Sequence, residues 1–410
     1  MTAATARTAL AAVALPGGGT EVRSFPLPPS GADSGLLRVE ASGVCGTDVS
    51  LYADGVARPT VLGHHVHGRI TEIGDVAARR WGVAPGDRVV IEEYLPCRAC
   101  GQCAAGRYRL CPRTDLWHGG RRVGLVPADE EPSLWGGNAQ YLYLPPEAVV
   151  HPVPEEVPEE LTAWTLPLAN ALDWVRGAGE LRAGETVVIL GPGHHGLAAV
   201  TAALHGGAGT VVVAGLARDR ARLEIAADLG ADTVELTETA SDSGPRDPHA
   251  EPGRPGPGET GATDSGTALH EHVARLTGGR MADVVLDLTG SGAATATGAL
   301  GLLAHGGRIV VAGGKGAASS PLDTGLLTRL TATVRGVRGR APERVTQSIR
   351  LLATAGAALA KVPTVHLPLD EVGPALDRLA AGTGPQTPHV VVRPWADPRP
   401  APGQEREEDR

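Results

Sequence analysis

The stretch 186-TVVILGPGHHGLAAVTAALHGGAGTVVVAG-215 decides the fold of this chain. An apolar run at 186–190 is followed at once by a glycine-rich turn, an alanine-rich segment that ends near residue 206, and a second apolar run at 210–214. Apolar runs of this length predict buried strands, and the alanine-rich segment between them predicts a helix. Strand, helix and strand in this order predict a parallel α/β unit.

The turn that follows the first strand has the spacing G-x-G-x-x-G. The first glycine permits a tight turn, the second lets the backbone approach a pyrophosphate, and the third lets the helix pack on the strand. The start of the helix supplies N–H groups that phosphates bind. A plain glycine-rich turn is the alternative, but the βαβ context favours dinucleotide binding. The predicted cofactor-binding residues are Gly191, Pro192, Gly193, His194, His195 and Gly196 of the turn, with Arg218 and Thr289 further along the chain.

The end of the second strand bears on the choice between NAD and NADP. An Asp or Glu there would hold the ribose 2′-OH of NAD, but the residue is Gly215. Arg218 and Arg220 follow closely, and an arginine can bind the 2′-phosphate of NADP. In the alternative interpretation these arginines are solvated and Asp219 only caps the next helix. Both cofactors therefore stay open, with a preference for NADP.

The rest of the chain divides into two patterns. Apolar runs at 282–288 and 308–311 extend the parallel sheet of the middle region. Before residue 155, short alternating runs such as 36–41 and 88–91 with turn signals predict an antiparallel, barrel-like domain. The apolar stretch at 10–15 is too short for a signal peptide and predicts a first strand. We therefore expect an α/β protein of two domains.

Composition excludes several classes of function. The chain has 410 residues, which is more than one compact core usually contains. Its formal net charge of -9 gives no broad attraction to nucleic acid or to anionic lipid. No run of 18 apolar residues is present, so a membrane span is not expected. We expect a cytoplasmic protein that acts on a small molecule.

The strongest metal signal is a cluster of four cysteines within fifteen residues. Cys97, Cys100, Cys103 and Cys111 have the spacing of a closed tetrahedral zinc site, which is structural because no coordination position stays open. An iron–sulfur cluster is the competing interpretation and is less favoured. The lobe at 95–113 is therefore predicted to hold structural zinc.

A second metal site is suggested by Val44-Cys45-Gly46-Thr47-Asp48 and Leu62-Gly63-His64-His65. A thiolate and an imidazole some twenty residues apart can be two ligands of another zinc ion. Together with Pro85-Gly86-Asp87-Arg88-Val89, Leu229-Gly230-Ala231-Asp232 and Gly306-Gly307-Arg308, these segments resemble the zinc-dependent medium-chain dehydrogenases, the family of alcohol, sorbitol and threonine dehydrogenases. The resemblance covers nearly the whole chain.

The resemblance implies a fold and a set of roles. The implied fold is a GroES-like barrel domain joined to a Rossmann doubly wound parallel sheet. The implied reaction is the reversible NAD(P)-linked oxidation of an alcohol to an aldehyde or ketone. Cys45 and His64 match ligands of a catalytic zinc, Thr47 matches the hydroxyl at the substrate oxygen, and Asp48 matches the carboxylate that orients the ligand histidine. A homodimer or homotetramer is usual in the family.

The departures from the family pattern concern the same site. His65 stands where glutamate usually follows Gly-His, and Leu166 and Gln140 replace acidic or thiol residues; Ser50 replaces a relay histidine. The third zinc ligand is therefore His65 or a water molecule. Two alternatives to the alcohol dehydrogenase remain, a zinc-independent NADPH-dependent enone or quinone reductase and a non-catalytic nucleotide-binding protein.

The domain bounds follow from these patterns. We expect a catalytic domain at 1–157 and 335–395 and a nucleotide-binding domain at 158–334. The segment 238–266 contains no aliphatic residue larger than alanine, so it is predicted to be a disordered insertion. The polar tail at 396–410 is also predicted to be disordered.

Overall fold

The computed structural model describes residues 7–237, 264–290, 298–313, 322–384 and 387–398. The chain divides into two compact units, of which the first comprises residues 1–166 and 341–410 and the second residues 167–340. Most of the predicted insertion and the end of the predicted disordered tail, at 238–263 and 399–410, lie outside the described residues. Helix α8 begins at Asp264, so the last three residues of the segment predicted as an insertion are helical.

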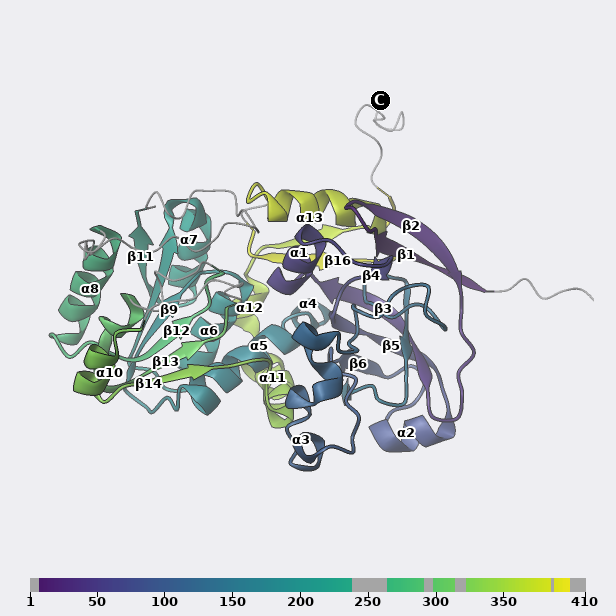
Figure 1. Cartoon of the computed structure of the whole chain (residues 1–410), viewed down its shortest axis with the longest axis horizontal. Helices are drawn as coiled ribbons and strands as arrows, with labels where there is room; N and C mark the ends of the chain where they lie inside the picture. The colour runs from purple at the N-terminus through teal and green to yellow at the C-terminus, as the bar shows by residue number, and fades with distance from the viewer. Residues whose placement is uncertain (1–6, 238–263, 291–297, 314–321, 385–386, 399–410) are drawn as a thin grey trace, which may run out of the picture. The chain divides into compact units, whose positions relative to one another are not determined.

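The second unit is built on a parallel sheet of six strands in the order β11-β10-β9-β12-β13-β14. If the strands are numbered along the unit, this is the order 3-2-1-4-5-6 of a Rossmann fold. The strands are parallel, and the order in which they are added to the sheet reverses between β9 and β12. The strands are β9 (Thr186–Leu190), β10 (Thr210–Leu216), β11 (Asp232–Leu236), β12 (Ala282–Asp287), β13 (Leu303–Val311) and β14 (Thr333–Gly336). The predicted doubly wound fold is confirmed (Figure 1).

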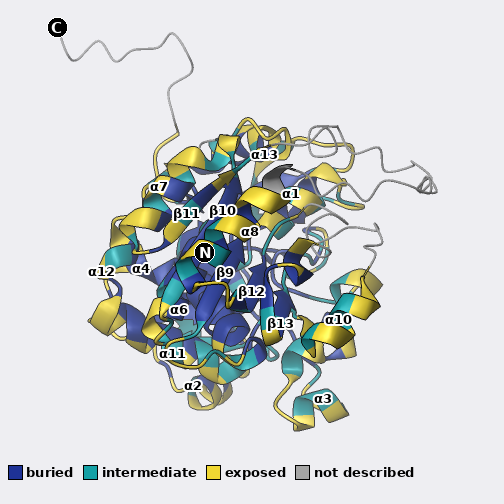
Figure 2. Ribbon diagram, turned by 90° about the vertical axis from the view of Figure 1, so that its left-hand side faces the viewer, coloured by how far each residue is buried: buried dark blue, intermediate teal, exposed yellow. Residues whose placement is uncertain are grey.

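Helices bury both faces of this sheet. Val188 of β9, Val212 of β10 and Val285 of β12 lie in one apolar cluster with Val273 of α8, whereas α6 packs beside β9 and β10 and contacts α7. Figure 2 shows β9, β10 and β12 buried. Burial on both faces explains why these strands are continuous apolar runs. The helices of this region are α5 (Thr165–Leu172, which crosses the division), the π-helical η4 (Asp173–Ala178), α6 (His194–His205), η5 (Ala217–Asp219), α7 (Arg220–Asp228), α8 (Asp264–Thr277) and α10 (Thr324–Leu330).

The first unit contains two sheets, in which neighbouring strands are antiparallel except for the pair β15–β16. One has the order β2-β1-β4; the other has the order β15-β16-β3-β5-β6-β8, with β7 also paired to β3. The strands are β1 (Thr8–Ala14), β2 (Thr20–Pro26), β3 (Gly35–Gly43), β4 (Thr60–Val61), β5 (His65–Ile73), β6 (Arg88–Ile91), β7 (Tyr141–Leu144), β8 (Val150–Pro152), β15 (Thr364–Leu367) and β16 (His389–Val392). The apolar stretch near the N-terminus is thus a strand, as predicted.

The helices of the first unit are short, apart from α11. Much of the core of this unit comes from its strands. Leu37, Val66, Val89 and Leu142 from four different strands form the centre of the larger apolar cluster. The helices are α1 (Gly46–Ala53), α2 (Asp75–Trp81), α3 (Gly101–Ala104), η1 (Tyr108–Leu110), η2 (Pro112–Thr114), η3 (Leu116–His118), α4 (Glu159–Thr162), α11 (Pro342–Ala355), α12 (Ala357–Ala360), η6 (Leu369–Glu371) and α13 (Val372–Ala380). Among the described residues no helix is long and apolar enough to cross a membrane.

Candidate active site and metal centres

Three potential metal ligands converge in the first unit. The sulfur of Cys45 and ring nitrogens of His64 and His65 all lie within 4.8 Å of one another. Cys45 and His65 are buried, and the side chain of His64 is 13% exposed. One sulfur and two imidazole nitrogens form a donor set that suits zinc. The residues present therefore fit a zinc ion, with room in a tetrahedral shell for one further ligand.

Two loops bring these residues together. Cys45 directly precedes α1, and its backbone N–H donates to Oδ2 of Asp48 over 2.9 Å, which caps the first turn of the helix. The backbone N–H of Gly63 donates to Oδ1 of the same carboxylate over 3.2 Å. Asp48, which is 2% exposed, therefore ties the cysteine segment to the histidine segment.

The turn before His64 requires glycine. Gly63 has a φ of +95°, in the left-handed region, and a Cβ there would lie 2.5 Å from Oδ1 of Asn138 and from Oγ of Ser42. The chain reverses at this point, so that His64 precedes β5 and His65 is the first residue of the strand. Their rings are in edge contact, with centroids 4.8 Å apart.

The Asp48 carboxylate also orients His64. Nδ1 of His64 lies 3.0 Å from Oδ1 of Asp48, and because a carboxylate only accepts hydrogen bonds, Nδ1 carries the proton. This leaves Nε2 for a metal, in the arrangement that is usual for a zinc-binding histidine. Burial opposes the charged form of the ring, but Asp48 and the Cys45 sulfur outweigh it and raise the pKa of His64 well above its usual value.

The other positions of this unit that the comparison with the family pattern singled out differ in how they relate to the cluster of Cys45, His64 and His65. Oγ1 of Thr47 lies 3.9 Å from Sγ of Cys45, so Thr47 borders the cluster. Ser50 is exposed on α1. Gln140 accepts a hydrogen bond from the backbone N–H of Leu10, so it serves the packing of β1. Leu166 is buried and offers no ligand atom.

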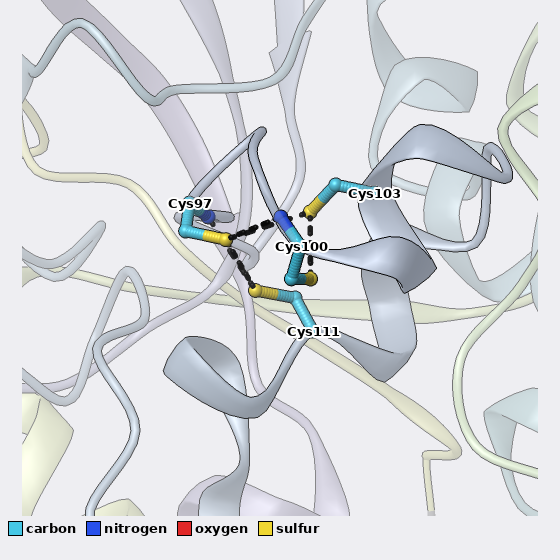
Figure 3. A group of neighbouring side chains, drawn as sticks. All are labelled: Cys97, Cys100, Cys103 and Cys111. Atoms are coloured by element: carbon cyan, nitrogen blue, oxygen red, sulfur yellow. Dashed lines mark hydrogen bonds between the residues drawn. The ribbon is translucent and has the colours of Figure 1, made fainter.

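The four cysteines of the predicted lobe form a compact sulfur cluster (Figure 3). The sulfur of Cys97 lies 3.6 Å from that of Cys111 and 4.0 Å from that of Cys103, and the sulfurs of Cys100 and Cys103 are 3.6 Å apart. All four are free thiols. Tetrahedral ligation at a Zn–S distance of 2.3 Å places sulfurs about 3.8 Å apart, so the cluster fits one zinc ion.

Backbone groups prepare the lobe for thiolates. The N–H groups of Ala99 and Cys100 lower the pKa of Cys97 to about 6. Burial, together with the neighbouring thiols, raises the pKa of Cys103 to about 12. The thiolate form of Cys97 is thus stabilised and that of Cys103 is destabilised. This pattern is expected where several thiolates lie close together, and a divalent cation would relieve the repulsion between their charges.

A buried carboxylate that sequence reasoning missed lies next to the lobe. Glu92, just past the end of β6, is fully buried and accepts hydrogen bonds on Oε1 from the hydroxyl of Tyr108 and from Nε2 of His151, the latter over 2.7 Å. Tyr108 belongs to the lobe, between Cys103 and Cys111, so this bond connects the lobe to the large sheet. In the sequence, only the acidic pair at 92–93, directly after the run at 88–91, could have indicated this buried carboxylate.

The second unit places the glycine-rich turn between β9 and α6. Gly191 has a φ of +102°. A Cβ on Gly196 would lie 2.1 Å from the carbonyl oxygen of Gly191, whereas a Cβ on Gly193 would meet no atom within 4 Å. The third glycine thus serves packing, and the second leaves open space beside the start of α6. The turn fits a bound pyrophosphate.

The end of β10 has no room for a carboxylate. A Cβ on Gly215 would lie 2.8 Å from Cγ of Pro192. Asp219 accepts hydrogen bonds from the N–H of Leu216 and from Arg222, and Arg220 binds Glu235 in a bidentate ion pair. Arg218 is exposed on η5.

Thr289 lies beside the first glycine of the turn. Its Cγ2 would be 3.5 Å from a Cβ on Gly191, and its hydroxyl donates to Oδ1 of the fully buried Asp287 over 2.8 Å. His194 and His195 are the first two residues of α6, and their rings are in contact at a tilt of 41°, with centroids 4.1 Å apart. The predicted residues of the turn thus lie at the carboxyl end of β9, and Thr289 lies at the carboxyl end of the neighbouring strand β12.

Two family models match the chain. Residues 31–155 match the alcohol dehydrogenase GroES-like domain, and residues 258–354 match the zinc-binding dehydrogenase domain. A "Probable alcohol dehydrogenase" from Mycobacterium tuberculosis is 40% identical over 303 residues, which cover 73% of this chain and 74% of the relative. An L-threonine 3-dehydrogenase from Xanthomonas oryzae is 28% identical and covers 89% of this chain and 94% of its own length.

Solved structures agree with this assignment. An alcohol dehydrogenase from Thermotoga maritima superimposes with a TM-score of 0.75 at 25% identity, over 94% of this chain and 99% of its own. A "putative zinc-binding dehydrogenase" from Sinorhizobium meliloti, solved with NADP bound, gives a TM-score of 0.74 at 26% identity, over 95% of this chain and 100% of its own. The resemblance seen in the sequence is confirmed: the chain is an oxidoreductase that belongs to the zinc-binding medium-chain alcohol dehydrogenase family.

Proposed function

We propose that the protein catalyses the NAD(P)-linked interconversion of an alcohol and an aldehyde or ketone, with a catalytic zinc ion on Cys45, His64 and His65. The observation that carries the proposal is the convergence of these three ligands, with Asp48 bonded to His64. When bound, zinc supplies a Lewis acid for the substrate oxygen, and the nicotinamide accepts or donates the hydride.

The chain's own residues handle the proton. Thr47 borders the ligand cluster, and its hydroxyl is placed to take the proton that the substrate alcohol loses. Ser50 lies three residues further along α1 on the same side of the helix and is exposed. The proton therefore passes from Thr47 to solvent within one helical turn, without the relay histidine that the family usually has.

We infer that NADP is the preferred cofactor. Pro192 excludes an acidic side chain at position 215, and Asp219 accepts a hydrogen bond from the N–H of Leu216. Arg218 is exposed on η5, directly after the end of β10, and a guanidinium at this place suits a 2′-phosphate. Arg218→Ala should raise KM for NADP and leave KM for NAD unchanged; an equal change for both would refute this role.

Zinc analysis combined with turnover tests the proposal. We expect two zinc ions per wild-type chain and one in Cys45→Ser, with alcohol oxidation lost and circular dichroism unchanged. Cys97→Ser is the matched variant, because it removes a thiol from the other cluster. One zinc in the wild type, with turnover of enones or quinones, would identify the zinc-independent reductase instead; one zinc and no turnover would identify a nucleotide-binding protein.

A further inference from the structure

A cavity of about 270 Å³ in the first unit is separate from both cysteine sites. It is formed by residues of α4, the end of α12, β15 and β16. Among the described residues that line it, none is a potential ligand of the Cys45 cluster and none belongs to the lobe at 95–113. Its apolar floor consists of the buried residues Ala163, Val362 and Val391. The cavity is smaller than pockets for drug-sized ligands, so it suits a molecule of a few carbon atoms.

Arg393, directly after β16, is a fixed donor in the lining of this cavity. Its NH1 donates to Oε1 of Glu159 over 2.6 Å and to the backbone carbonyl oxygen of Glu40 over 3.4 Å. Its Nε donates to Nδ1 of His366 over 3.4 Å. A guanidinium has five N–H groups, and among the contacts of the described residues none uses the two on NH2. Arg393 therefore keeps one edge of its guanidinium for a ligand.

Two further charged side chains line the same cavity. Glu160 belongs to α4 and Lys361 directly follows α12, and these two short helices are in contact. Both residues are exposed. Within the part of the chain that the structure describes, neither side chain forms an ion pair or a hydrogen bond, with the other or with a third residue. An acid and a base thus face one small cavity without neutralising each other.

The charges select the class of ligand. Arg393 and Glu159 form an ion pair that is neutral as a whole. Burial and the guanidinium of Arg393 lower the pKa of His366, so its ring is uncharged at neutral pH. The charges that remain are the Lys361 ammonium and the Glu160 carboxylate. Glu160 would repel a simple anion and Lys361 a simple cation, whereas a zwitterion is attracted by both.

We propose that this cavity binds a small aliphatic α-amino acid. Its carboxylate would face Lys361 and the NH2 edge of Arg393, because a guanidinium suits a carboxylate. Its ammonium group would face Glu160, and its aliphatic side chain would lie on the apolar floor. This inference is independent of the proposed alcohol oxidation, since the cavity shares no residue with the cluster of zinc ligands.

Three probes with one carbon skeleton test the class of ligand. Titration calorimetry on the zinc-loaded full chain would compare L-valine with isovalerate, which lacks the ammonium group, and with isobutylamine, which lacks the carboxylate. We expect saturable binding of L-valine and at least about tenfold weaker binding of the other two. Equal affinity for L-valine and isovalerate, or for L-valine and isobutylamine, would overturn the zwitterion, as would no binding of L-valine.

Two substitutions test the position of the site. Glu160→Gln should weaken L-valine binding by about tenfold and remove its preference over isovalerate, whereas Lys361→Gln should weaken the binding of both acids. Both positions are exposed, so the variants should fold, which circular dichroism checks. Glu156→Gln, at an exposed position outside the lining, is the matched control and should change nothing. Unchanged L-valine affinity in Glu160→Gln or in Lys361→Gln would refute the site.

The Cys45 cluster is the other place where an amino acid could bind, because its amino and carboxylate groups can both ligate zinc. L-valine affinity should therefore be the same in Cys45→Ser as in the wild type. Loss of binding in Cys45→Ser, with unchanged affinity in Glu160→Gln, would place the ligand at zinc and overturn this inference without affecting the proposed function. Retained L-valine binding in a wild type that holds one zinc ion would refute only the proposed function.

Discussion

Nδ1 of His64 donates a hydrogen bond to Oδ1 of Asp48 over 3.0 Å. The same carboxylate accepts the backbone N–H groups of Cys45 and Gly63. One buried side chain therefore sets the helix cap, the turn and the direction of Nε2 of His64. Because the orientation of a ligand decides how tightly it holds a metal, the relationship has a measurable consequence.

Asp48→Asn should weaken zinc binding at the Cys45 cluster by about 10–100-fold, because the amide still accepts a hydrogen bond from His64 but no longer carries the charge that polarises the ring. Competition with a chelator measures the affinity. Asp54→Asn at the exposed end of the same helix should have no effect. Equal affinity in Asp48→Asn and wild type would mean that His64 does not bind the ion.

His65→Ala decides between an imidazole and a water molecule as the third ligand. We expect zinc at this cluster to be lost on dialysis, because two protein ligands rarely hold zinc. His118→Ala, which removes an exposed imidazole, is the control. Retention of both zinc ions in His65→Ala, with turnover intact, would assign the position to water.

Cys111→Ser should remove zinc from the lobe and leave the Cys45 cluster loaded. Cys111 is fully buried, and the metal-free lobe would lose the bonds that zinc forms between its two ends. We expect faster proteolysis within residues 95–113 and a lower Tm. Zinc content of one per chain with a protected lobe would contradict a structural role for the ion.

Two glycines of the dinucleotide turn should respond differently to alanine. Gly196→Ala forces a Cβ against the Gly191 carbonyl and should lower the free energy of unfolding by about 1–3 kcal/mol. Gly193→Ala adds a methyl group to open space, so stability should be unchanged while dinucleotide affinity falls. Urea unfolding and calorimetry measure the two effects. Unchanged dinucleotide affinity in Gly193→Ala would move the pyrophosphate away from this turn.

The pair Glu185–Arg308 should make stability depend on pH. Burial opposes the charged form of Glu185, but the bidentate contact with Arg308, at 2.5 and 3.2 Å, outweighs it and lowers the pKa below 4.5. The unfolded chain then binds more protons at acidic pH, so the stabilisation is complete above about pH 4.5 and is lost as the pH falls through the lower folded-state pKa.

Glu185→Gln is accordingly expected to cost about 1.5–3 kcal/mol of unfolding free energy at neutral pH and progressively less below the unfolded-state pKa of Glu185. Urea unfolding over this pH range measures the difference. Glu180→Gln, in an exposed pair with Arg335, is the matched control and should cost less than about 1 kcal/mol. A cost for Glu185→Gln that does not change with pH would show that packing, not charge, is responsible.

Much of the fold follows from local patterns. The apolar runs at 186–190 and 210–214 predicted β9 and β10 because strands buried on both faces cannot alternate with polar residues. The cysteine spacing predicted the lobe because ligands close in sequence converge without help from distant elements. The types and spacing of Cys45 and His64 allowed a second zinc site, and the resemblance gave them the role of catalytic ligands.

Other features depend on contacts between distant residues. Glu92 and His151 are 59 residues apart, and Asn170 and Arg340 are 170 apart, so no periodicity connects them. The conflict between Pro192 and a side chain at position 215 also arises only when β9 and β10 are paired in register.

The sequence by itself determined the strands, the glycine turn and the metal-binding thiols, because period, turn chemistry and ligand spacing act over a few residues. Only the tertiary structure decided that His65 lies within ligand distance of Cys45 and that the Asn170 amide lies between a buried arginine and His195. Hydrogen bonds between buried groups depend on direction as well as distance, and packing of the whole domain fixes that direction.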